Sequence, residues 1–65
     1  MSKLRVGNIV LCRFYNTPAG KFYGEFWRGE IVAIDLSSNK PYTVSRGTAG
    51  TISLHRKEIK RVVVR

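Results

Sequence analysis

The chain has few of the side chains on which metal sites and disulfides depend. Its 65 residues include one cysteine, Cys12, and one histidine, His55. A structural zinc site needs four ligands, so these two residues predict no metal site. A lone cysteine cannot form an internal disulfide, which favours a reducing, cytoplasmic setting, with or without association with the nucleoid.

Carboxylates are also scarce. The four acidic residues are Glu25, Glu30, Asp35 and Glu58, and they show no spacing typical of a catalytic acid–base pair. No glycine-rich phosphate loop leads into a helix. A chain of this length has a thin core, and one copy has little room for a cleft that excludes water. We therefore predict a protein that is not an enzyme and needs no cofactor.

Long apolar runs are missing from the sequence. No stretch approaches the ~20 residues that a membrane helix needs, and no apolar signal core follows residues 1–5. Yet 43% of the residues are hydrophobic, which is near the value for a globular domain and argues against a disordered basic tail. We expect a single folded domain over residues 1–65, without a membrane partner.

What the chain does contain is a series of short alternating segments between turn residues, the pattern of an all-β fold. It predicts strands over residues 6–15, 22–36, 42–45, 51–54 and 61–65, and a 3₁₀ turn within 55–59. Gly29 inside a strand indicates a bend or a close backbone approach, and a bulge is expected before Ile34. The predicted core comprises Val10, Phe14, Ile31, Tyr42, Val44, Ile52 and Ile59.

These segments resemble an SH3-like small barrel of the Tudor kind. The resemblance rests on Val6-Gly7-Asn8, the segment from Trp27 to Ile31, Tyr42-Thr43-Val44, and Ile59. It implies a five-stranded, strongly bent antiparallel barrel with a 3₁₀ turn before the last strand. Function does not follow from this fold, because the same barrel performs unrelated tasks.

The resemblance implies three uses, and the residues argue against two of them. Capture of methylated lysine or arginine needs an aromatic cage with acidic residues nearby, but no carboxylate lies between Tyr42 and Glu58. Plasmid-type dihydrofolate reductases have a similar Trp-x-Gly-x-Ile-Val segment, but the Gln and Tyr of their pore are missing from residues 51–54. The third use, nucleic-acid binding, agrees with the charge.

Positive charge is the strongest functional signal in the sequence. Twelve Lys and Arg oppose four Asp and Glu, a net charge of +8. Residues 40–65 carry seven basic and one acidic side chain, a net of +6, compared with five and three, a net of +2, before them. Such an excess favours a polyanionic partner, either nucleic acid, an anionic membrane surface or an acidic protein.

The candidate binding residues are basic side chains near the last predicted turn and the hairpin tip, together with Tyr23 and Arg28 from a segment where aromatic and basic residues interleave. They are Tyr23, Arg28, Lys40, Arg46, Arg56, Lys57, Lys60 and Arg61. Basic clusters of this kind neutralise phosphates, although they also occur as ordinary solvated surfaces. Aromatic rings beside cations suit base stacking, but Trp27 is better explained as a residue that fills a small barrel.

We therefore expect a small basic protein that binds nucleic acid, DNA more than RNA, mainly through phosphate contacts. The alternative is a protein-interaction module or inhibitor that docks on an acidic surface of a nucleic-acid enzyme. The size and organisation of the chain resemble those of small proteins from phages and mobile elements. Oligomeric state and sequence preference stay open at this point.

Overall fold

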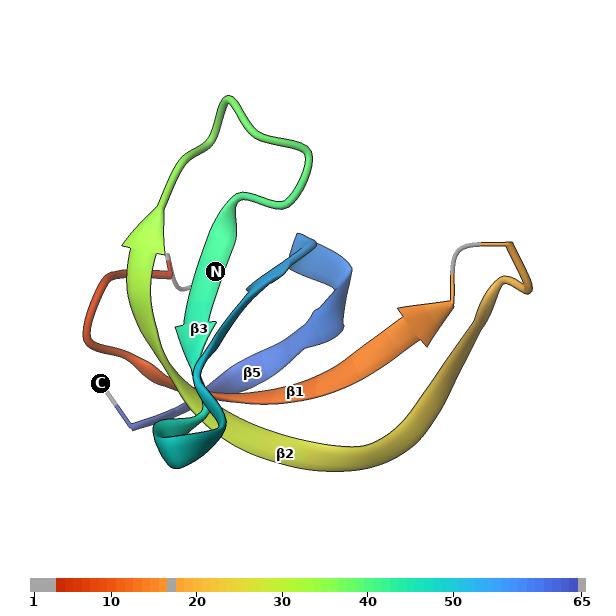
Figure 1. Ribbon diagram of the computed structural model, residues 1–65, viewed down its shortest axis with the longest axis horizontal. Helices are drawn as coiled ribbons and strands as arrows, with labels where there is room; N and C mark the ends of the chain where they lie inside the picture. The colour runs from red at the N-terminus through yellow and green to blue at the C-terminus, as the bar shows by residue number, and fades with distance from the viewer. Residues whose placement is uncertain (1–3, 17, 65) are drawn as a thin grey trace.

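The computed structural model describes residues 4–16 and 18–64, which form one bent antiparallel sheet (Figure 1). Its strands are β1 (Ile9–Asn16), β2 (Lys21–Ile34), β3 (Tyr42–Ser45), β4 (Thr51–Leu54) and β5 (Ile59–Val64). Two 3₁₀ turns, η1 (Gly47–Ala49) and η2 (Arg56–Glu58), precede β4 and β5. The strand order β4-β3-β2-β1-β5 leaves the sheet open, with β4 and β5 at its edges. The predicted fold, a five-stranded and strongly bent SH3-like barrel, is confirmed.

The predicted strand ends differ from the structure by two or more residues at three places, each with a local cause. β1 begins at Ile9 and not at Val6, because the Arg5 N–H donates to Asn8 Oδ1 at 2.8 Å and folds residues 5–8 into a turn. β2 ends at Ile34, where the Ser37 hydroxyl donates to Asp35 Oδ1 at 2.6 Å. β5 already begins at Ile59, which pairs with Cys12; Arg65 lies outside the described residues.

The core lies on the inner face of the bent sheet. Its fully buried side chains are Val10, Cys12, Ile31, Val44, Leu54 and Ile59. Four of the seven predicted core residues are among them. The other three, Phe14, Tyr42 and Ile52, are half-buried and pack against this cluster. The pairing of β1 with β5 ends at Cys12. Phe14 lies two residues beyond this point, where β5 no longer runs beside β1.

β2 and β3 approach each other closely at Gly29. A Cβ atom at this position would overlap Val44 Cγ1 and lie 2.8 Å from the Ser45 carbonyl oxygen. The predicted close backbone approach is therefore confirmed. The predicted bulge is present as well, as a register shift between Ile31 and Ala33. Together they let β2 curve tightly around the core.

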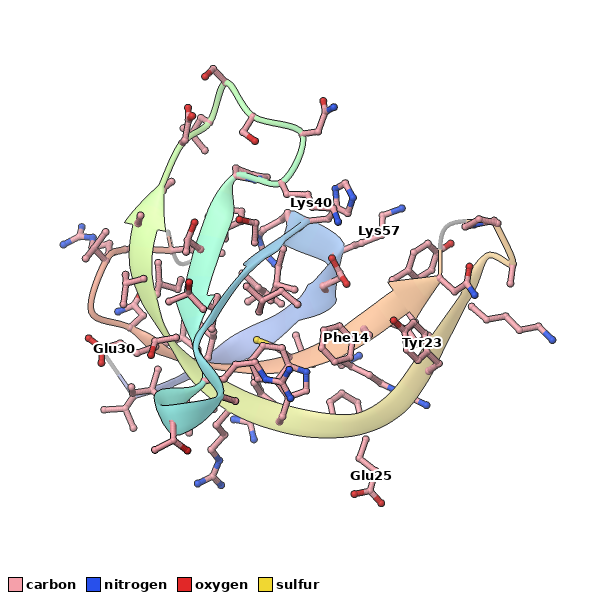
Figure 2. All side chains as sticks on the ribbon, in the orientation of Figure 1. Phe14, Tyr23, Glu25, Glu30, Lys40 and Lys57 are labelled. Atoms are coloured by element: carbon pink, nitrogen blue, oxygen red, sulfur yellow. The ribbon has the colours of Figure 1, made fainter. Side chains whose placement is uncertain are left out.

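A second irregularity bends β2 at residues 24–26, a part of the strand that lies farther from the core. Phe14 pairs with Tyr23 and Cys12 with Trp27, so Arg13 alone opposes the three residues 24–26. Gly24 takes the positive φ of 74° that this bulge requires, and Arg13 Nε donates to its carbonyl oxygen at 3.0 Å. Figure 2 shows the result: Phe14 and Tyr23 lie inside the curve of β2, and Glu25 points outward.

The bend sets off a two-stranded ribbon from the barrel. β5 pairs with β1 only as far as Cys12, and the pairing of β3 with β2 begins at Glu30. Residues 13–16 and 18–27 thus extend as a hairpin, here called the β1–β2 arm, which projects to the right in Figure 1. The described residues contain no helix long and apolar enough to cross a membrane.

Candidate functional site

Aromatic side chains are concentrated on the β1–β2 arm. Six of the seven aromatic residues of the chain lie between positions 14 and 27. On the inner face, the Phe14 ring stacks on Tyr23 with centroids 5.7 Å apart and contacts Trp27 at 5.4 Å. On the other face, Tyr15 and Phe22 meet edge to face at 4.9 Å. Both faces of the arm therefore carry rings.

Cations from three parts of the fold lie over these rings. Arg46, which precedes η1, places its Cζ 4.7 Å from the Trp27 centroid and 5.4 Å from that of Phe14. Lys57 of η2 places its Nζ 4.5 Å from the Tyr15 centroid. Arg13 Cζ lies 5.2 Å from the Phe26 ring. These distances are within the range of cation–π attraction, so the arm is both aromatic and positively charged.

Glu58 attaches η2, and with it Lys57, to the arm. Its carboxylate is buried and accepts two backbone hydrogen bonds, from the His55 N–H at 3.0 Å and from the Tyr15 N–H at 3.2 Å. The first bond closes the 3₁₀ turn, and the second joins it to the edge of β1 that β5 leaves unpaired. A carboxylate that accepts backbone N–H groups makes strong, charge-assisted bonds. Glu58 therefore holds the backbone of η2, which carries Lys57, against β1.

The four basic residues that the sequence predicts around the last turn are exposed. Arg56 and Lys57 belong to η2, and Lys60 and Arg61 to the start of β5; all four side chains are exposed. Arg56 Nη1 donates to the Ile59 carbonyl oxygen at 2.9 Å, so part of its guanidinium also closes the turn. We call these four residues the η2–β5 patch.

The other four predicted site residues lie in three places, one of which is close to Arg61 of the η2–β5 patch. Arg28 and Arg61 both pair with Leu11, one from each side, so they share the outer face of the sheet. Arg46 and Tyr23 belong instead to the inner face, through their common contacts with Phe14. Lys40 is exposed in the loop between β2 and β3. Tyr23 and Arg28 therefore lie on opposite faces of the sheet.

Cys12 lies in the core, and Trp27 packs against it. Trp27 is half-buried and packs against the core, and its indole Nε1 is buried without a hydrogen-bond partner among the described residues. Burial, and secondarily the negative charge of Glu58, raises the pKa of the Cys12 thiol to about 11. A neutral buried thiol is a poor nucleophile. In residues 4–16 and 18–64, no three His, Cys, Asp or Glu side chains come together as metal ligands do.

Sequence reasoning did not find the contacts of Arg46 with Phe14 and Trp27, or of Lys57 with Tyr15. The available signal was the concentration of aromatic residues in one hairpin, which marks the arm but not its cationic partners. Comparison of the chain with protein-family models, with curated proteins and with solved structures gave no match. The functional argument therefore rests on the geometry and charge of the arm and of the η2–β5 patch.

Proposed function

We propose that this protein binds nucleic acid, DNA more than RNA, mainly through phosphate contacts. The observation that carries the proposal is the η2–β5 patch in a chain of net charge +8. Exposed Lys and Arg side chains that neutralise phosphates release condensed counterions, which is the main driving force of sequence-independent binding. Such contacts position a protein on the backbone and specify no base.

The fold is compatible with this proposal but does not by itself indicate a function. The bent second strand at Gly29, the short β3 and the buried Ile59 after η2 are the features that suggested a Tudor-like barrel. We propose that the chain is a small, cytoplasmic, non-enzymatic member of this group, of the kind that phages encode. The buried, protonated Cys12 supports a non-catalytic role, since it offers no reactive thiolate.

The salt dependence of binding tests the proposal directly. Affinity for random-sequence duplex DNA, single-stranded DNA and RNA is measured by filter binding over a series of salt concentrations. If about four phosphates are contacted, log affinity for duplex DNA falls against log salt with a slope of about −3.6. Unrelated duplex sequences should bind equally, and RNA more weakly.

A charge-removing double variant locates the contacts. Lys57→Ala with Lys60→Ala should make the slope shallower by about 1.8, because two phosphate contacts are lost. The matched control, Lys57→Arg with Lys60→Arg, keeps both charges and should keep the parental slope. An unchanged slope in the alanine variant would show that the η2–β5 patch is only a solvated surface.

Failure of the parent protein to bind any nucleic acid at low salt would favour the alternative partner. An acidic surface of a nucleic-acid enzyme presents the same charge to the η2–β5 patch. A pull-down from nuclease-treated lysate, with the alanine double variant as its control, then tests that docking module or inhibitor role.

A further inference from the structure

The inner face of the β1–β2 arm ends in a ring that the barrel does not cover. Tyr23 is 53% exposed although it stacks on Phe14, which in turn contacts Trp27. The rings thus form a row that starts in the core and ends in solvent. An exposed aromatic face at the end of such a row is held in place by its neighbour and is available to a further flat group.

Arg46 determines the charge of the group that fits this face. Its guanidinium lies over both Phe14 and Trp27, where an aromatic cage would hold a cationic ligand. A methylated lysine or arginine would therefore have to displace a cation that the chain already supplies. A guanidinium stacked by its face keeps its N–H groups at the edge, where they suit a phosphate.

We propose that the inner face of the arm binds an unpaired base of a single-stranded nucleic acid, stacked on Tyr23, with the adjoining phosphate on Arg46. The inference rests on the proposed function and names the form of nucleic acid that the arm selects. In a duplex, both faces of an internal base are covered by its neighbours. Only an unpaired base offers its face to the ring, and every base has such a face.

The test separates the contribution of the base to binding from the contribution of the phosphates. Binding is measured for an oligothymidylate of about ten nucleotides, a length in the range that one small barrel covers, and for an abasic strand of equal length. Tyr23→Ala should weaken oligothymidylate binding by about 5- to 150-fold, the value of one lost stacking contact. The abasic strand should bind the parent and Tyr23→Ala equally, because it has no base that could stack on the Tyr23 ring.

Two further variants serve as controls. Phe22→Ala removes the neighbouring ring, which is similarly exposed at 46% but lies on the other face of the arm. It should leave oligothymidylate affinity unchanged. Tyr23→Phe keeps the ring face and should bind as the parent does.

Several outcomes would overturn the inference. One is a parent protein that binds the abasic strand as tightly as oligothymidylate, in which case phosphate binding stands and base stacking fails. Another is an equal loss in Phe22→Ala and Tyr23→Ala, which would contradict the choice of the inner face. A polyglutamate peptide that competes as well as oligothymidylate would favour an acidic protein. Absence of binding to duplex, abasic strand and oligothymidylate alike would reject the proposed function as well.

Discussion

The rest of the described chain, here called the body, buries its apolar side chains, whereas the β1–β2 arm leaves several of its aromatic side chains exposed. In the body, apolar side chains from all five strands meet in one buried cluster, and the only buried charged side chain among the described residues, Glu58, is hydrogen-bonded. On the arm, three aromatic side chains remain about half exposed, Phe22, Tyr23 and Phe26. From this difference we expect truncations in the body to lower the free energy of unfolding more than truncations on the arm.

The most severe test of this contrast is truncation of Ile59 in the body. Ile59→Ala removes a side chain buried in the core cluster and should lower the free energy of unfolding by about 2–5 kcal/mol. Thermal or denaturant unfolding measures the loss. Val64→Ala, on the same strand but 55% exposed, should change stability by less than about 0.5 kcal/mol. Equal stability of Ile59→Ala and the parent would show that this residue does not anchor the barrel.

A smaller effect is expected where body and arm are joined. Glu58→Gln keeps the size of the side chain but replaces one acceptor oxygen by an amide, so either the His55 N–H or the Tyr15 N–H loses its partner. The expected cost is about 1–3 kcal/mol in unfolding experiments. Glu25→Gln makes the same chemical change on the exposed arm and should be nearly neutral. A neutral Glu58→Gln would mean that the carboxylate does not hold η2 against β1.

The last prediction concerns the pH dependence of the body. The pKa of Cys12 is raised in the folded state from about 9 to about 11, so the unfolded chain loses the thiol proton first. The stabilising contribution of the protonated thiol is complete below pH 9 and disappears between about pH 9 and 11. The stability difference between the parent and Cys12→Ala should shrink over that interval. A difference that is constant from pH 8 to 11 would contradict this burial.

Much of the body was predictable because strand alternation is a local property. Proline and glycine bound β3 and β4, and the predicted ends of these two strands agree with the structure. The start of β1 was harder to predict, because the Asn8 side chain competes with strand formation by accepting a hydrogen bond from the Arg5 N–H. A pattern of apolar residues does not report such a bond.

The site was predictable in composition but not in arrangement. The excess of charge in residues 40–65 is visible in the sequence. Alternation along β2 places Arg28 on the face opposite Trp27, but the contact of Arg46 with Trp27 joins residues from distant parts of the chain, and alternation does not reveal it. The buried role of Glu58 likewise depends on η2 meeting the edge of β1, a tertiary contact that spacing alone does not reveal.

The place of β5 at the edge of an open sheet has a consequence for aggregation. An edge strand presents unpaired N–H and C=O groups, which a second copy of the same strand can bind. Lys60 and Arg61 lie on this strand, and like charges on two approaching edges repel each other. The residues proposed to attract phosphate thereby also keep separate molecules of this protein from joining into a continuous sheet.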